Sequence, residues 1–282
     1  MQGIESPSKF YEVYQNFKSL IYQVVEMNNF SQNKNEISDA IKSAYDKNYN
    51  SFMSWFNASE SFEMSMIRGT WDFSSYFITP DVCRYISEPE KKKCLEIGYG
   101  GGRLLHASRN FFQYSYGVDI HPYSDFVRQK LIDRSPCEDF SLIQLKNDKF
   151  PLKDNSIHYV YSFIVIQHFY SIEILQSYLA EISRVLVSGG LVNLFFADLF
   201  KYSSKCSLFY LNSLMAGYME IPNPPNEKTA NNTLWVSLRW VKKRLSELGF
   251  KIISHSPSYK GIPDGYPLKK GSQTGILAQL KS

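Results

Sequence analysis

The feature that most constrains this chain is a short apolar run that stops at a cluster of glycines. The run is Cys-Leu-Glu-Ile at residues 94–97, and the glycines that follow it are Gly98, Gly100, Gly101 and Gly102. An apolar run of this length, ended by glycines, predicts a buried strand of a parallel sheet. The glycines predict a tight turn that side chains would obstruct, and a helix is expected to open directly after it. The free N–H groups of that helix would point back at the turn, which favours a polar or anionic ligand group there.

Three residues around the turn distinguish it from the dinucleotide-binding fingerprint. That fingerprint places a small residue where the helix crosses the strand, and the corresponding position here is Arg103. Glu96 lies inside the strand, where a carboxylate disfavours a pyrophosphate and favours a cationic ligand group. Asp119 ends a second apolar run at residues 116–119. It follows the first glycine by about twenty residues, a spacing at which an acid binds two ribose hydroxyls.

The motif Glu96-x-Gly98-x-Gly100-x-Gly102, followed by Asp119, resembles that of class I S-adenosylmethionine-dependent methyltransferases. The resemblance runs from about residue 94 to the C-terminus and is closest to the small-molecule, methyltransferase type 11-like branch. It implies S-adenosyl-L-methionine as the cofactor, with the glycine turn under its methionine portion. It further implies that Glu96 faces the ammonium group and that Asp119 binds the ribose. The alternative is a Rossmann-like domain that binds another nucleotide or no ligand.

The resemblance implies an α/β fold, namely a Rossmann-like, doubly wound, seven-stranded sheet that is mostly parallel with an antiparallel last strand. We expect a methyltransferase domain at residues 91–282, preceded by a helical cap at residues 1–90. Apolar residues at helical spacing support helices within the cap at residues 10–24 and 37–56. Another helix is expected to start at Pro80 and run through Tyr85.

The predicted cap has two interpretations. It is either a layer that packs aromatic residues for stability or association, or a lid that excludes water from the site of methyl transfer. Under the second interpretation, the candidates for contact with the substrate are Arg68, Trp71 and Tyr76.

The remaining elements are expected to alternate along the chain. Strands are predicted at residues 140–145, 157–166, 190–197, 251–256 and 274–280. Ser124 and Ser237 are predicted as the N-caps of two helices, and a third helix is predicted to run from Ser171 to its stop at Gly189. By the resemblance, Ile120 packs on the adenine, and either Asn147 or Asp148 meets the adenine amino group; both stay open.

Two residues are candidates for the base that a hydroxyl acceptor requires. Functional groups gather at the carboxyl ends of strands in open parallel sheets. The strand predicted at residues 157–166 is followed by Gln167 and His168, so His168 is expected near the transferred methyl group, with a side chain suited to accept a proton. The alternative role for His168 is a structural one, in which its side chain is hydrogen-bonded to the backbone. Asp198, beyond the fifth strand, is the second candidate.

Residues 199–234 have no clear periodicity and are expected to form the acceptor pocket, as insertions after the fifth strand do in the family. The Asn-Pro-Pro sequence at residues 223–225 superficially matches a motif of enzymes that methylate amino groups of nucleic acids. That motif belongs after the fourth strand and ends in an aromatic residue. We therefore interpret residues 223–225 as a loop.

Composition narrows the class of protein further. The chain has 282 residues with a formal net charge of +4, which is too slight for a nucleic-acid-binding surface. Its four cysteines have no paired metal-binding spacing, and no metal is expected. No apolar run suits a membrane span and no signal peptide is apparent, so a cytoplasmic location is expected. A homo-oligomer is compatible with the sequence.

The leading interpretation is therefore an enzyme that transfers a methyl group to a small-molecule or sugar acceptor at oxygen. The alternatives are a methyltransferase that acts on protein or nucleic acid, and a non-catalytic cofactor-binding subunit.

Overall fold

The structure, a computed structural model, describes residues 51–52, 56, 61–201, 208–221, 232–260 and 269–281, with backbone alone for residues 208–211, 260 and 269. All of them belong to one compact unit, Ser38–Ser282. The helix expected at residues 10–24, most of the helix expected at residues 37–56, and the Asn-Pro-Pro segment lie outside the described residues.

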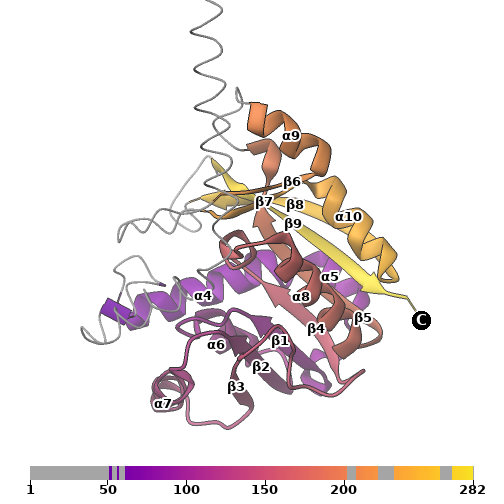
Figure 1. Cartoon of the computed structure of the whole chain (residues 1–282). Helices are drawn as coiled ribbons and strands as arrows, with labels where there is room; N and C mark the ends of the chain where they lie inside the picture. The colour runs from indigo at the N-terminus through magenta and orange to yellow at the C-terminus, as the bar shows by residue number, and fades with distance from the viewer. Residues whose placement is uncertain are drawn as a thin grey trace, which may run out of the picture. The chain divides into compact units, whose positions relative to one another are not determined.

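A seven-stranded sheet forms the centre of this unit (Figure 1). Its strands are β1 (Lys93–Ile97), β2 (Tyr114–Asp119), β3 (Phe140–Gln144), β4 (Ile157–Ser162), β5 (Leu186–Ala197), β8 (Phe250–Lys260) and β9 (Lys269–Leu280). Their order across the sheet is β3-β2-β1-β4-β5-β9-β8. The strands from β3 to β5 in this order pair in parallel, whereas β9 is antiparallel to β5 and β8. The predicted seven-stranded, mostly parallel sheet with an antiparallel last strand is confirmed.

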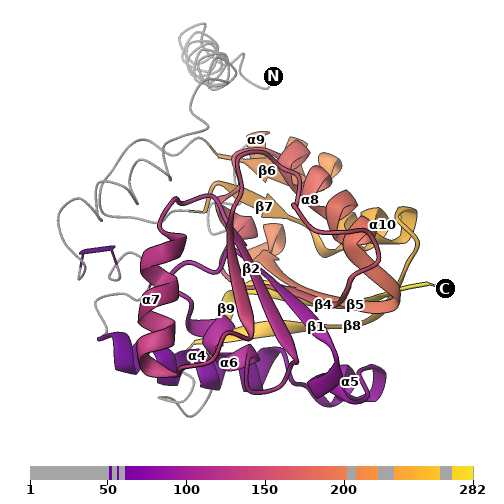
Figure 2. The ribbon, with the colours of Figure 1, turned by 90° about the horizontal axis from the view of Figure 1, so that it is seen from below.

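Helices cover both faces of the sheet, as Figure 2 shows. One face carries α4 (Phe62–Tyr76), α5 (Pro80–Tyr85) and α6 (Arg103–Ser108), and the other carries α8 (Ile172–Val185) and α10 (Leu238–Glu247). A separate group of buried apolar side chains lies under each set of helices. Because both faces are buried, the central strands read in the sequence as continuous apolar runs.

The direction of strand addition reverses between β1 and β4. β2 and β3 lie on one side of β1, and β4 and β5 lie on the other. In an open parallel sheet, ligands bind in the crevice at the carboxyl ends of the strands where this reversal occurs. The glycine turn follows β1 at that place, and residues 163–165 follow β4.

Helix α4 is built into the domain. The side chain of Ser61 caps its first turn by accepting a hydrogen bond from Met64 N, and Phe73 and Tyr76 on its inner face are buried. Gly69 marks the place where α4 crosses the start of α6, since a Cβ atom there would lie 2.2 Å from the carbonyl oxygen of Arg103. Asn193 of β5 donates a hydrogen bond of 2.9 Å to the carbonyl oxygen of Tyr76, which ties the end of α4 to the sheet.

The strand expected at residues 157–166 is shorter than predicted. β4 ends at Ser162, and the chain then turns at Ile164, whose φ is +61°. A positive φ is rare for a residue with a branched Cβ, so no apolar pattern could have indicated this turn. The short 3₁₀ helix η2 (Ile166–His168) follows, and His168 therefore lies beyond the strand end.

Two helix boundaries also differ from those predicted. The helix expected to run to Gly189 ends at Val185, because Leu186 already pairs with β4 as the first residue of β5. α7 (Ser124–Arg134) has Tyr123 as its N-cap, so Ser124 is its first residue. The helix predicted from Pro80 through Tyr85 is confirmed as α5.

The segment between β5 and α10 contains η3 (Leu199–Lys201), α9 (Leu208–Ala216), β6 (Tyr218–Glu220) and β7 (Leu234–Val236). β6 and β7 pair in a small antiparallel sheet of their own. Across the described ranges, no helix combines the length and the apolar character that crossing a bilayer requires.

Candidate cofactor and acceptor site

The glycine turn has a backbone that only glycine adopts readily. Gly98, Gly100 and Gly102 have φ angles of +75°, +50° and +83°. A Cβ atom on Gly98 would lie 2.3 Å from Cγ2 of Val165, and one on Gly100 would lie 2.6 Å from the ring of Phe56. Both the backbone conformation and the close packing therefore exclude side chains at Gly98 and Gly100.

The end of β2 fixes both backbone polar groups of Gly100. Gly100 N donates to Asp119 Oδ2 at 2.8 Å, and His121 Nε2 lies 3.1 Å from Gly100 O. Tyr123 N donates to Nδ1 of the same imidazole, so Nε2 carries the proton that binds Gly100 O. Asp119 also accepts from Ile120 N at 2.7 Å. A carboxylate has about four lone-pair sites, so Asp119 retains capacity for ligand hydroxyls.

Glu96 is a buried acid at the end of β1. Only 2% of its surface is exposed, and Tyr161 donates a hydrogen bond of 3.3 Å to its Oε2 atom. Burial raises the pKa of Glu96 to about 8; the Arg103 charge opposes this rise and the Asp119 charge adds to it. Glu96 and Asp119 thus lie within electrostatic reach of each other. A cationic ligand group beside Glu96 would favour its ionised form.

Residues expected near the adenine follow two adjacent strands. Ile120 is 38% exposed directly after β2. Asn147 and Asp148 follow β3, whose last residue pairs with Asp119. The side chain of Asn147 accepts a hydrogen bond of 3.0 Å from Lys149 N and so closes a local turn, while Asp148 is partly buried. The choice between Asn147 and Asp148 stays open.

The two candidate bases lie on different elements. His168 ends η2, with Nε2 3.2 Å from the side-chain nitrogen of Gln167. Asp198 follows β5 and is largely buried; its Oδ2 accepts a hydrogen bond of 2.7 Å from Thr274 of β9, and its Oδ1 accepts one from Phe200 N. Both oxygens of Asp198 therefore have partners that join β5 to neighbouring backbone and to β9. The catalytic role of either residue stays a prediction.

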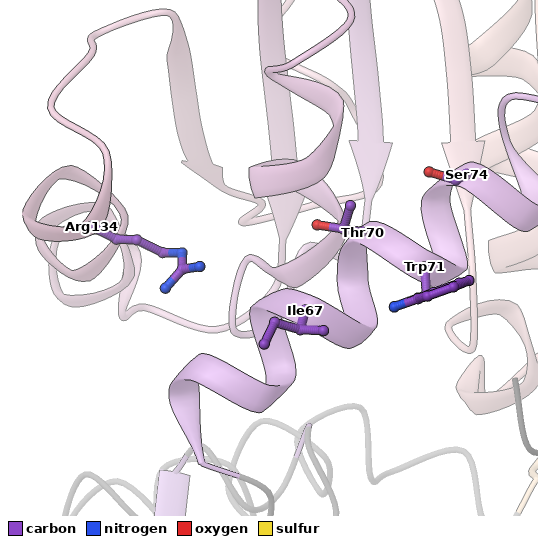
Figure 3. A pocket seen from close by; sticks show the side chains of 5 residues that line it. All are labelled: Ile67, Thr70, Trp71, Ser74 and Arg134. Atoms are coloured by element: carbon purple, nitrogen blue, oxygen red, sulfur yellow. The ribbon is translucent and has the colours of Figure 1, made fainter. Parts of the chain in front are cut away.

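The candidate substrate contacts of α4 point to different environments. Trp71 is 49% exposed and lines an open surface hollow of about 380 Å³ with Ile67, Thr70, Ser74 and Arg134 (Figure 3). None of the predicted cofactor residues lines that hollow. Tyr76 is buried, and its hydroxyl group donates to the carbonyl oxygen of Tyr259 and accepts from Tyr259 N. Arg68 is partly buried on the same helix.

Several side chains at the site were not singled out by sequence reasoning. They are Phe56, Asp72, Tyr161 and Val165, with Arg103 noted only for its size. For Tyr161, alternation with Tyr159 in β4 was an available signal. Asp72 and Phe56 reach the turn from segments that precede β1, and no local pattern connects them with it. In the described part of the chain, His, Cys, Asp and Glu side chains form no group of three or more that could hold a metal ion.

The fold is similar to that of several solved S-adenosylmethionine-dependent methyltransferases. One from Methanosarcina mazei has a TM-score of 0.53 and 16% identity, covering 72% of this chain and 98% of its own. One from Mesorhizobium loti has a TM-score of 0.53 and 12% identity, covering 76% and 99%. One from Clostridium acetobutylicum has a TM-score of 0.52 and 12% identity, covering 81% and 96%. At such low identity these similarities define the class of fold.

A family model matches part of the sequence. Residues 95–194 match the model of a methyltransferase domain, whereas no curated protein matches the chain. This part of the chain is a methyltransferase domain, and the protein is an enzyme whose cofactor is S-adenosyl-L-methionine. The site fits that cofactor, because a buried acid, a turn built on Gly98 and Gly100, and an acid at the end of β2 meet at the carboxyl ends of β1 and β2.

Proposed function

We propose that this enzyme methylates an oxygen atom of a small-molecule or sugar acceptor. The observation that carries the proposal is the character of the segments after β4 and β5. Ile164, Phe200 and Met215 in these segments are 43%, 57% and 91% exposed. The ammonium group of Lys201 is directed to the carbonyl oxygens of Gly271 and Gln273. Exposed apolar side chains in these segments support an organic acceptor over a polyphosphate backbone, which requires rows of Lys and Arg.

The proposed roles at the cofactor follow from the same geometry. Glu96 would face the ammonium group, Asp119 would bind the ribose hydroxyls, and Ile120 would pack on the adenine. When bound, the cofactor supplies an electrophilic methyl group. The protein must then align the acceptor oxygen and take up its proton.

His168 is the proposed base, and Asp198 is the second candidate. A neutral imidazole accepts a proton near physiological pH without a large shift of its pKa. Asp198 is less suited, because hydrogen bonds from Thr274 and Phe200 N already engage its two oxygens. We also propose that residues 199–234 build the acceptor pocket and that the segment at residues 1–90 covers the site.

The class of acceptor is testable with cofactor that carries a labelled methyl group. The purified enzyme is incubated with a cell extract, which is then separated into small molecules, protein and nucleic acid. We expect the label in the small-molecule fraction. Label in precipitated protein or RNA would overturn the proposal, and cofactor binding without transfer to any fraction would favour a non-catalytic subunit.

A substitution tests the base. With the acceptor identified, His168→Gln is expected to lower kcat by about 10²- to 10⁴-fold while cofactor binding is unchanged. Asp198→Asn is the comparison, and a larger loss of kcat in that variant would exchange the two roles.

A further inference from the structure

Arg103 occupies an unusual position for a large side chain. It is the first residue of α6, directly after Gly102, at the carboxyl end of β1. Its carbonyl group is packed against Gly69 of α4, so its backbone is fixed between two helices. A fold that needed only close packing here would favour a small residue. The arginine side chain therefore has a use other than filling space.

The guanidinium group of Arg103 is held from two sides. Its NH1 atom donates to Asp72 Oδ2 of α4, and its Cζ atom lies 5.9 Å from the centre of the Phe163 ring. The exposed fractions of the Arg103 and Asp72 side chains are 15% and 11%. Among the described residues, the Arg103 side chain hydrogen-bonds only to Asp72. A guanidinium group has five N–H donors in a planar fork, so a second acceptor can be bound beside Asp72.

Arg103 also lies close to Glu96. Its positive charge is the strongest influence that lowers the pKa of the Glu96 carboxyl group against the effect of burial. Glu96 and Arg103 thus place a carboxyl and a guanidinium group at the same end of β1, without a hydrogen bond between them among those described. The amino-acid end of the cofactor carries an ammonium and a carboxylate group on one carbon atom. An acid that a bound ammonium group would ionise, together with a guanidinium group, matches the two charges of such a zwitterion.

We propose, on the basis of the cofactor assigned above and independently of the acceptor, that Arg103 binds the carboxylate of the cofactor's methionine portion. Asp72 acts as its positioning residue from α4. Burying the Arg103–Asp72 ion pair costs desolvation energy, whereas two packed apolar side chains would not have this cost. Binding of a ligand carboxylate by Arg103 gives a reason for the pair to be there. A carboxylate bound by the guanidinium fork would be recognised through charge-assisted hydrogen bonds.

The test compares two ligands that differ in the carboxylate alone. These are S-adenosylhomocysteine and its decarboxylated analogue, in which an aminopropyl group replaces the amino acid and the ammonium is kept. Binding is measured by titration calorimetry. The full-length enzyme is expected to prefer S-adenosylhomocysteine by about ten- to a hundredfold. In Arg103→Met the preference is expected to disappear, with affinity for the analogue changed less than about threefold.

Two further variants separate binding from structure. Arg103→Lys keeps the charge without the fork and should retain part of the preference. Arg128→Met is the matched control, since Arg128 also pairs with an acid, Glu138, and lies over an aromatic ring, that of Phe140. It should leave the preference intact. Thermal unfolding of each variant verifies that it is folded.

The outcomes distinguish this proposal from the cofactor assignment. Equal binding of both ligands by the unmodified enzyme would overturn the role of Arg103 alone. An equal loss of affinity for both ligands in Arg103→Met and Arg103→Lys would show a structural role and overturn it as well. Binding of neither ligand by the unmodified enzyme would overturn the cofactor assignment together with this proposal.

Discussion

The two ends of the site are built in different ways. At the β2 end, Gly100 is fixed by Asp119 and His121 through hydrogen bonds to its N–H and carbonyl groups. At the β4 end, Ile164 holds an unfavourable backbone conformation and leaves 43% of its surface exposed. Buried polar groups whose hydrogen bonds are formed within the protein make a rigid site, which suits a ligand that is always the same. Strain beside exposed apolar surface is typical of a place where structure is adapted to a particular substrate.

The largest effect is expected from a side chain on the glycine turn. Gly98→Ala places a methyl group against Val165 at a backbone φ of +75°, which should cost about 2–5 kcal/mol of unfolding free energy. Gly189→Ala is the control, because Gly189 has a φ of +76° but a Cβ there would be 3.9 Å from its nearest neighbour. Both variants have the same backbone strain, so the difference between their losses of unfolding free energy in urea measures the contribution of packing alone. Equal losses would show that the turn is not tightly covered.

The next largest effect is expected from Asp119→Ala. The variant loses the proposed ribose contacts and the acceptor for Gly100 N, so the cofactor Kd should rise by about a hundredfold. Calorimetry with S-adenosylhomocysteine gives the measurement. Asp125→Ala, at an exposed acid of α7, should leave the Kd unchanged. An unchanged Kd in Asp119→Ala would mean that the β2 end is rigid for another reason.

A smaller effect is expected from pH, through Glu96. Its pKa in the folded protein is about 8, above its ordinary value of 4.5. Between pH 4.5 and pH 8, the folded state therefore keeps a proton on Glu96 that the unfolded state has lost. The contribution of Glu96 to stability is complete below pH 4.5 and is lost as pH rises toward 8.

Cofactor binding should follow the opposite trend. An ammonium group pairs with ionised Glu96, so the affinity should rise by up to about tenfold per pH unit as pH approaches 8. Calorimetry in two buffers of different protonation enthalpy should detect the released proton. Glu96→Gln should abolish the proton release, whereas Glu181→Gln, at an acid paired with Arg184, should not. A flat pH profile in the unmodified enzyme would show that Glu96 is already ionised.

The smallest effect is expected at the β4 end. Ile164→Asn puts a residue that tolerates positive φ at the strained position, which should raise the unfolding free energy by about 1 kcal/mol. It also removes exposed apolar surface and should raise the KM of the acceptor. Ile164→Val keeps both the strain and most of the apolar surface and serves as the comparison. A loss of stability in Ile164→Asn would remove the contrast between the two ends.

The β2 end could be predicted because its determinants are local. A strand, a turn and an acid each have a signature within a few residues, and Glu96, Gly98, Gly100 and Asp119 were all selected in this way. The seven-stranded, mostly parallel sheet with an antiparallel last strand was implied by the resemblance, and the structure confirms it.

The β4 end could not be predicted to the same depth. The apolar run at residues 157–166 continues through the turn at Ile164, so nothing in the pattern ends the strand. Asp198 is held by Thr274, which is 76 positions away, and Arg103 is held by Asp72, which is 31 positions away. Pairings over such separations depend on the assembled fold, and a single sequence contains no signal of them.

The crossing of α4 over α6 determines the smallest fragment of the chain that is expected to fold with an intact cofactor site. Residues 95–194 carry the family match, but Gly69 and Asp72 touch the first residue of α6 from outside that range. A fragment that starts at β1 would expose the sheet face that Phe73 and Phe77 cover and would release Arg103. Phe56 packs on Gly100 from still earlier in the chain, so truncation or domain-fusion work on this enzyme should keep the chain from Ser51 onward.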